Sequence, residues 1–277
     1  MLIKPNDRHD IEAIARLLPP FPKVVLQLLE LLRDEASSFE VMGRLIRNDP
    51  VLAGNVLGQA NHVRRLHAQS DLADPFAAAS LIGINRLRKI VVSIGMNRFI
   101  GGGAGSDFFF KHSFAVAVTT QELAVMCDVS PDEAYITGIL HDVGQLSFHV
   151  MDEQAFLQAY EQSTADGRLL EREAEIFGAD HCQMGAELAQ YWNLPEDVVS
   201  AIRAHHDDRL ATSHLQAAVC LGETLARALD MPVSSKNRVL KINRPACELL
   251  GIRWDSPEML DCFGRCHARF VQGAGHF

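Results

Sequence analysis

Histidines and acidic residues recur along the second half of the chain in an order that could build a metal site. In chain order they are His112, His141, Asp142, His181, His205, His206 and Glu223. A neutral imidazole nitrogen is a good ligand for a transition metal, and a carboxylate is a harder, anionic ligand that can bridge two ions. The adjacent pair His141-Asp142 alone is weak evidence. The ordered set predicts one site that several segments assemble.

A structural interpretation of the same residues stays open. A lone histidine on a partly apolar helix is usually a packed or surface residue, and a polar cluster can persist without a metal. Cys262, Cys266 and His267 form a second group, to which Cys247 could add a ligand. Cysteine-rich zinc sites favour two paired halves, and a second half is missing here. Cysteines on a helix face are therefore the preferred interpretation of this group.

The segments around the candidate ligands carry the signals of amphipathic helices, and strand signals hardly occur. Asp180 and Pro195 are typical of helix starts, and His141 follows the end of an apolar helical stretch. The expected helices run over 108–126, 131–140, 181–192, from 195 into 205, and 215–229. Ligands from five separate helices can meet only in a tertiary bundle, a fold that hosts metal sites on inward-facing side chains.

The rest of the chain is also predicted to be helical. Further helix starts are expected at Pro22, Ser37, Asp49-Pro50, Asp74-Pro75 and Ser256-Pro257. The run Gly101-Gly102-Gly103-Ala104-Gly105 has the backbone freedom of a linker. It lacks the preceding strand and the Lys-Ser/Thr ending of a nucleotide loop. We therefore expect an all-α protein with subdomains 1–100 and 106–230 and a helical extension over 231–277.

Composition limits the class of protein. The chain has 277 residues, 48% of them hydrophobic, which favours a folded chain with a sizeable core. It has neither a long apolar run nor a signal-peptide core, so a cytoplasmic protein is expected. Cys127, Cys182 and Cys220 lie in apolar helical contexts and are expected to pack as small hydrophobic side chains.

Charge is distributed unevenly along the chain. Residues 44–98 hold eight Lys and Arg against three Asp and Glu, although the formal net charge of the whole chain is −9. A basic segment could bind a phosphate-bearing ligand such as a nucleotide, but a solvated helix face or a contact between subdomains is the commoner cause. The overall acidity argues against bulk binding of nucleic acid.

Several short motifs together resemble the HDOD domain, a bacterial signalling module distantly related to HD metal-dependent phosphohydrolases. They are Leu18-Pro19-Pro20-Phe21-Pro22, Asp49-Pro50-Val51-Leu52, Ser80-Leu81-Ile82-Gly83, Gly138-Ile139-Leu140-His141-Asp142-Val143-Gly144, Asp180-His181 and His205-His206. The resemblance spans roughly residues 18–227. It implies a helical N-terminal subdomain packed on an HD-like helical bundle, and a regulatory role, since most HDOD modules have no assigned catalytic activity.

The candidate ligands are also similar, in the same order, to the ligand set of HD-GYP phosphodiesterases. Three positions depart from that pattern. Glu223 stands where that superfamily has aspartate, and Gln145 replaces a lysine that contacts the substrate phosphate. The residues after His206 lack Gly-Tyr-Pro, so recognition of cyclic di-GMP is unsupported.

These observations predict a cytoplasmic HDOD-type protein that signals mainly through contacts with protein partners. The alternative is a metal-dependent phosphohydrolase that acts on a nucleotide or cyclic nucleotide. The expected cofactor is a divalent metal bound by His112, His141, Asp142, His181, His205, His206 and Glu223. Iron or manganese suits this His/carboxylate set best, with zinc and nickel as alternatives.

Overall fold

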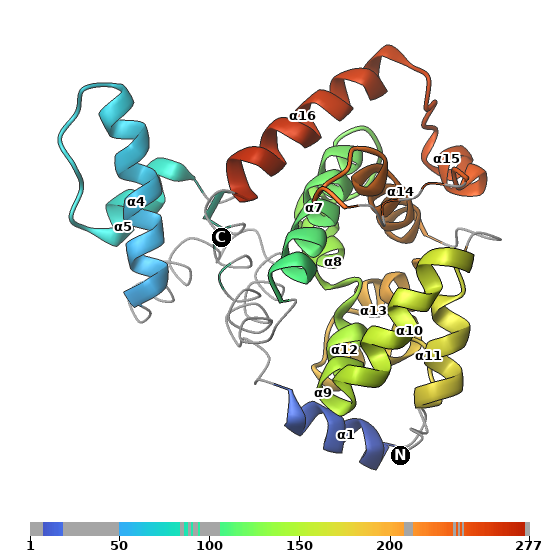
Figure 1. Cartoon of the computed structure of the whole chain (residues 1–277). Coiled ribbons are helices and arrows are strands. Elements are labelled where there is room, and N and C mark those ends of the chain that lie inside the picture. Colours follow the sequence, from blue (N-terminus) through green and yellow to red (C-terminus); the bar gives the residue numbers. More distant parts are fainter. Residues whose placement is uncertain are drawn as a thin grey trace. The chain divides into compact units, whose positions relative to one another are not determined.

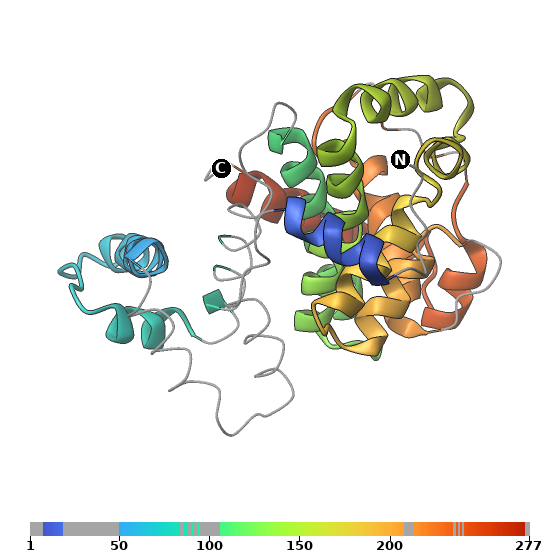
Figure 2. The same cartoon turned by 90° about the horizontal axis from the view of Figure 1, so that it is seen from below.

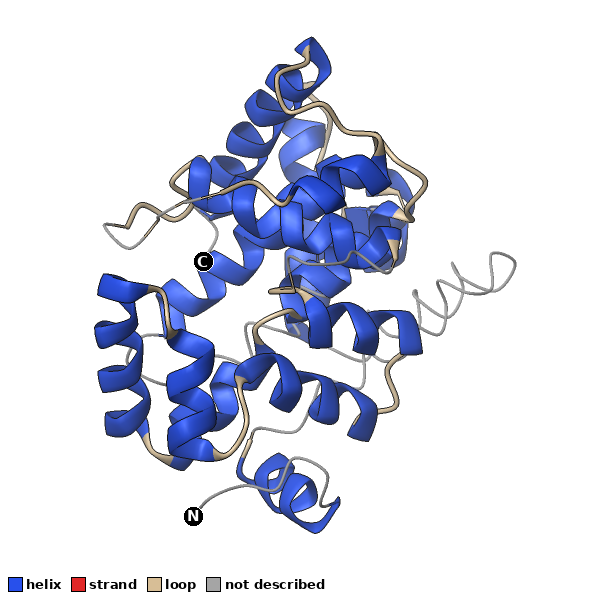
Figure 3. Cartoon of the chain, turned by 90° about the vertical axis from the view of Figure 1, so that its right-hand side faces the viewer, coloured by secondary structure: helices blue, strands red, loops and turns tan. Residues whose placement is uncertain are grey.

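The computed structural model of the chain describes residues 8–18, 50–83, 106–207, 213–234 and 241–274, with the isolated residues 86, 87, 90, 94, 237 and 239. Within these ranges every regular element is a helix, which confirms the predicted all-α class (Figure 3). The chain forms two compact units, Pro22–Phe99 and Met1–Phe21 with Ile100–Phe277. The subdomain bounds 1–100, 106–230 and 231–277 stay predictions, because compactness alone does not test which segments fold independently.

The smaller unit contains α4 (Pro50–Leu66) and α5 (Pro75–Ile82), which pack against each other. Asp74 begins α5 as predicted: its carboxylate accepts a hydrogen bond from the backbone N–H of Ala77 at 3.0 Å, just before Pro75. Asn61 on α4 both donates to the carbonyl of Leu72 and accepts from its N–H. This pair of bonds fixes the loop between the two helices.

The larger unit contains the candidate ligands. Its helices are α1 (Arg8–Leu17), α7 (Ser106–Ala124), α8 (Pro131–Leu140), α9 (Val143–Met151), α10 (Glu153–Asp166), α11 (Leu169–Phe177), α12 (His181–Tyr191), α13 (Glu196–Ala204), α14 (His214–Ala228), α15 (Arg244–Leu250) and α16 (Pro257–Ala274). Helices α8, α14 and α16 all pack on α7 (Figure 1), and α1 contacts α9 and α12 (Figure 2). The buried face of α7 is therefore the centre of this unit.

Small residues let the helices approach α7 closely. A Cβ added at Gly222 of α14 would lie 2.2 Å from the hydroxyl oxygen and 3.0 Å from the backbone nitrogen of Thr120 on α7, so a larger residue would force the two helices to shift. The Thr119 hydroxyl donates to the Gly222 carbonyl at 2.7 Å and holds the same crossing. This contact fixes Glu223, the next residue of α14, against the central helix.

The extension after residue 230 packs on the same unit. Helix α15 contacts α14, and α16 lies along α7. The Arg265 and Arg269 side chains of α16 donate to the carboxylate of Glu122 on α7, a residue that is 6% exposed. Cys262 and Cys266 are fully buried on α16, as expected for cysteines on a helix face.

Most predicted helices near the candidate ligands agree with the structure to within about two residues. The Pro22, Ser37 and Gly101–Gly105 predictions lie outside the described residues. None of the helices in the described part of the chain is long and apolar enough to cross a membrane.

Candidate metal centre

Asp142 lies at the centre of four imidazoles. Its Oδ2 atom is 3.3 Å from His141 Nε2 and 3.7 Å from His112 Nε2. Its Oδ1 atom is 3.3 Å from His181 Nε2 and 3.4 Å from His205 Nε2. All five residues are buried. The two oxygens of one carboxylate therefore face two different pairs of histidines, the arrangement expected of a carboxylate between two ions.

Helix ends bring these side chains together. His141 is the C-cap residue of α8, and His205 is that of α13. His181 is the first residue of α12, because the Asp180 side chain caps that helix. Asp142 occupies the N-cap position of α9 but makes no side-chain capping bond. Its carboxylate is thus left to face the imidazoles.

Gly144 sets the distance between α9 and α12. A Cβ at this position would lie 2.1 Å from the carbonyl oxygen of His181 and 2.7 Å from the backbone nitrogen of Gly185. Real Cβ atoms do not approach backbone atoms so closely. Glycine here lets the backbone of His181 lie directly against the turn that carries Asp142.

Three of the histidines have their Nδ1 atoms committed to neighbouring acceptors. Nδ1 of His141 is 2.7 Å from the Gly138 carbonyl, Nδ1 of His205 is 2.6 Å from the Ile202 carbonyl, and Nδ1 of His181 is 2.6 Å from the Glu173 carboxylate. Neither a carbonyl oxygen nor an ionised carboxylate can donate a proton, so Nδ1 carries the hydrogen in these contacts. In a neutral ring, Nε2 then has a lone pair that points toward Asp142. An imidazole in this tautomer can bind a metal through Nε2.

The residues present fit a divalent cation. Within the described part of the chain, Nε2 of His112, His141 and His181 and Oδ1 of Asp142 are buried without a hydrogen-bond partner. An imidazolium bound to a carboxylate would lie ~2.7–2.9 Å from it. Two ligand atoms ~2.1 Å from one ion, at angles of ~90–110°, are instead ~3.0–3.4 Å apart. Three of the four nitrogen–oxygen separations, at 3.3–3.4 Å, match the spacing expected for two ligand atoms of one ion.

Burial sets the charge state of several of these groups. Desolvation, helped by the nearby positive charge of Arg227, lowers the pKa of His112 to about 4. Burial likewise lowers the pKa of His206 to about 3. Both rings are therefore neutral at pH 7 and able to ligate. Burial also acts on His181, but the Glu173 carboxylate outweighs it and raises the pKa of that ring well above its usual value, so an ion that binds at its Nε2 would displace a proton.

Glu223 and His206 form the more open side of the cluster. His206 Nδ1 is 3.4 Å from Glu223 Oε2, and the other oxygen, Oε1, accepts a hydrogen bond from Arg227 at 2.6 Å. The His206 side chain is 28% exposed, the largest fraction in the cluster. Candidate ligand atoms of Glu223, His112 and His141 also lie within 4.8 Å of one another.

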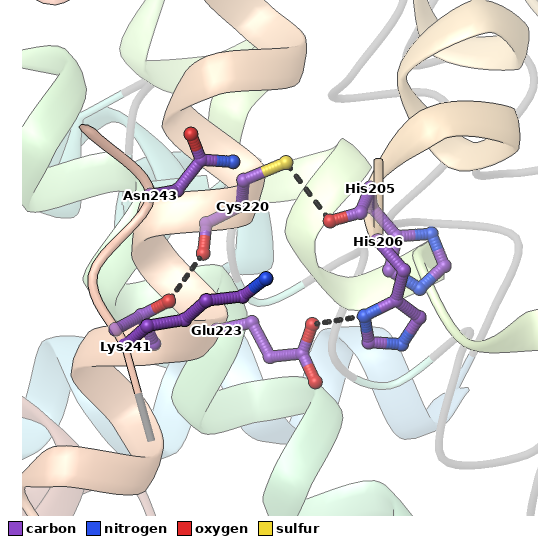
Figure 4. A pocket seen from close by; sticks show the side chains of 7 residues that line it. His205, His206, Cys220, Glu223, Lys241 and Asn243 are labelled. Atoms are coloured by element: carbon purple, nitrogen blue, oxygen red, sulfur yellow. Dashed lines mark hydrogen bonds and ion pairs between the residues drawn. The ribbon is translucent and has the colours of Figure 1, made fainter. Parts of the chain in front are cut away.

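A pocket opens beside this side of the cluster. Its volume is about 160 Å³, and it is lined by His205, His206, Cys220, Glu223, Thr224, Lys241 and Asn243. Figure 4 shows the Lys241 side chain extending into the pocket toward Glu223 and His206. Lys241 and Asn243 come from the segment between α14 and α15.

The structure brings all seven predicted site residues into one region, and their role as ligands stays a prediction. Sequence reasoning missed several neighbours of the cluster: Glu173, Cys182, Arg227, Lys241 and Asn243. Cys182 was interpreted as a packing residue because the positions around it are apolar. The signal that could have identified it is its place directly after His181. Glu173 and Lys241 gave no local signal, since only tertiary packing brings them here.

The HDOD domain family matches residues 18–208 of the chain. The chain belongs to this family. An uncharacterized protein of Treponema pallidum is 25% identical over 198 residues, which are 69% of this chain and 38% of that protein. Ribonuclease Y of Campylobacter jejuni is 28% identical over 148 residues, 53% of this chain and 23% of the enzyme. The HDOD chain thus spans well under half the length of these relatives.

Three solved structures share the fold. An HDOD domain protein of unknown function from Geobacter sulfurreducens has a TM-score of 0.75 at 21% identity, covering 97% of both chains. A candidate phosphohydrolase from Shewanella amazonensis has a TM-score of 0.73 at 23% identity, covering 98% of this chain and 99% of that one. A candidate signal transduction protein from Marinobacter aquaeolei has a TM-score of 0.74 at 18% identity, covering 96% of this chain and 60% of that one.

Proposed function

We propose that this HDOD protein is a signalling component that holds a divalent metal at Asp142 and acts mainly through contacts with protein partners. The main support for the metal site is the position of Asp142 between two pairs of histidines. Most of these histidines use Nδ1 for a hydrogen bond to another group, which leaves Nε2 for an ion. Several of the Nε2 atoms are buried without a hydrogen-bond partner among the described residues. A bound cation would satisfy these atoms, whereas packing alone would leave them without a partner.

Each group has a distinct part in this site. His112 and His141 would hold an ion on the Oδ2 side of Asp142, and His181 and His205 on the Oδ1 side. Glu173 would keep the His181 ring in its ligating tautomer by accepting the Nδ1 proton. Glu223 and His206 would complete the set at the open side. A bound divalent ion would supply Lewis acidity toward a phosphoryl oxygen and a water molecule of lowered pKa.

Two features favour a regulatory role over catalysis. Gln145, at the position where related phosphodiesterases have a phosphate-contacting lysine, is buried and carries no charge. The pocket beside the cluster, at about 160 Å³, is smaller than the ~300–1,000 Å³ usual for small-molecule sites. A dinucleotide would not fit it without a large movement. The candidate signal transduction protein with the same fold is consistent with the regulatory role.

Elemental analysis of the purified protein tests the metal site. The wild-type chain should retain iron or manganese, with zinc and nickel as alternatives, while His141→Ala and Asp142→Ala should lose it and keep their helical content. His267→Ala, on α16, is the matched control and should keep the ion. Equal metal content in all four proteins would refute the site.

The partner role needs a cellular test. Proteins crosslinked to the wild-type chain in its own cells should differ from those crosslinked to Asp142→Ala, because the ion stabilises the folded site that partners would recognise. Identical partner sets at equal protein levels would refute a metal-dependent signalling role.

A metal-dependent phosphohydrolase is the second candidate function, and Lys241 is the observation that favours it. Its ammonium group extends into the pocket beside Glu223 and His206, where it could replace the cation that Gln145 does not provide. Phosphoryl transfer requires such positive charge near the equatorial oxygens. Ribonuclease Y, a relative of this chain over 148 residues, is also consistent with this candidate.

Hydrolysis assays separate the two candidates. We expect metal-loaded protein to hydrolyse cyclic di-GMP no faster than His141→Ala, and a generic phosphodiester only slowly. Turnover of either at ~1 s⁻¹ or faster, lost in His141→Ala, would establish the hydrolase instead. Lys241→Ala should in that case raise KM for the phosphodiester.

A further inference from the structure

Cys182 is a buried thiol that lies beside histidines of the candidate metal centre. Its Sγ atom is 3.9 Å from Nε2 of His205, and the residue is only 5% exposed. Candidate ligand atoms of His181, Cys182, His205 and His206 all lie within 4.8 Å of one another. The thiol follows His181 in the first turn of α12, on the Oδ1 side of Asp142.

The two sides of Asp142 therefore offer different atoms. On the Oδ2 side, His112, His141 and Glu223 form a group with nitrogen and oxygen donors. On the Oδ1 side, His181 and His205 stand next to a sulfur atom. Hard oxygen ligands favour manganese and magnesium, whereas thiolate favours zinc and other softer ions.

We propose that Cys182 is a thiolate ligand of the ion held by His181, His205 and His206, so that one half of the centre contains sulfur. This inference rests on the metal binding proposed above. When the bond to sulfur forms, the thiol proton passes to solvent, as metal binding to cysteine requires.

Two geometric observations support the assignment. A nitrogen ~2.1 Å and a sulfur ~2.3 Å from one ion are ~3.6 Å apart at the tetrahedral angle, and the observed 3.9 Å corresponds to a slightly wider angle. Independently, Nε2 of His181 is buried without a hydrogen-bond partner among the described residues, with its Nδ1 bound to Glu173. His181 also offers a ligand atom within 4.8 Å of the sulfur, so that one cation could bind both residues.

Cys220 provides the matched control. It is equally buried and also contacts His205, but its thiol donates a hydrogen bond to the backbone carbonyl of that residue at 2.8 Å. The thiol of Cys220 therefore already has a hydrogen-bond partner in the backbone. A serine at position 220 can make the same bond, so Cys220→Ser removes a nearby sulfur while it leaves the cluster intact.

Zinc-edge X-ray absorption on the zinc-loaded full chain tests the inference directly. Wild type and Cys220→Ser should show a sulfur scatterer at ~2.3 Å beside the nitrogen and oxygen scatterers, and Cys182→Ser should show none. The cobalt-loaded protein should show thiolate-to-cobalt charge-transfer absorption in the near ultraviolet, again lost only in Cys182→Ser. Zinc affinity should fall by ~10-fold or more in Cys182→Ser, with a smaller change for manganese.

The outcomes are separable. A wild-type chain that binds no zinc, cobalt or manganese would overturn the proposed metal site itself. A wild-type chain that binds zinc with nitrogen and oxygen scatterers alone would overturn the role of Cys182 and leave the metal site standing. This second measurement needs no variant, so a Cys182→Ser protein that fails to fold would not prevent the test.

Discussion

Replacing Gly144 with alanine tests whether close contact between α9 and α12 positions the metal cluster. The added Cβ would lie 2.1 Å from the His181 carbonyl oxygen, and ordinary contact begins at 3.4 Å, so the two helices must separate by about 1.3 Å. Overpacking of this kind costs ~1–3 kcal/mol, against which alanine regains ~1 kcal/mol of helix propensity. His181 would move with its helix, away from Asp142.

Gly264→Ala is the matched control, because Gly264 also lies inside a helix but has no atom within 4 Å of an added Cβ. Chemical denaturation, followed by circular dichroism, should show Gly144→Ala less stable than wild type by up to ~2 kcal/mol and Gly264→Ala more stable by ~0.5–1 kcal/mol. Metal content should fall in Gly144→Ala alone. Unchanged stability and metal content in Gly144→Ala would refute the role assigned to this contact.

Three further substitutions follow from the structure. Glu173→Gln should weaken metal binding ~10–100-fold, as measured by chelator competition, while Glu175→Gln on the exposed face of the same helix should not. Glu223→Asp shortens the reach by one methylene and should alter metal affinity or identity; equal metal content in wild type, Glu223→Asp and Glu223→Gln would make Glu223 a bystander. Glu122→Gln should destabilise the protein by ~1–3 kcal/mol at pH 7. Burial alone would raise the pKa of Glu122, but Arg265 and Arg269 hold it below its ordinary value of 4.5. The stabilisation from Glu122 is thus complete above pH 4.5 and disappears as the pH falls through the lowered pKa, so acid titration should destabilise wild type more than Glu122→Gln.

Helices were predictable from the sequence because their ends carry local signals. Asp180 caps α12 with its own carboxylate, and Pro131 follows the capping residue of α8. Such signals need only a few neighbouring residues. They also placed His141 and His181 at helix ends, where side chains can turn toward a common centre.

The rest of the site depends on contacts between distant segments. Glu173 and His181 are eight residues apart and separated by a turn at Gly178, and nothing local pairs them. Lys241 reaches the pocket from beyond the segment that the HDOD family matches. Cys182 is buried, as predicted, but its position beside His205 was not predicted, because a cysteine among apolar residues is usually a packing residue. In this chain, imidazole rings from other helices lie beside its sulfur atom.

The most direct test of the central claim is anomalous X-ray diffraction from crystals of the metal-loaded protein, recorded on either side of the absorption edge of the metal found by elemental analysis. We expect anomalous density at the Asp142 carboxylate, with one peak toward His112 and His141 and one toward His181 and His205. Ordered side chains at Asp142 without any anomalous peak, in crystals grown with excess metal, would contradict it.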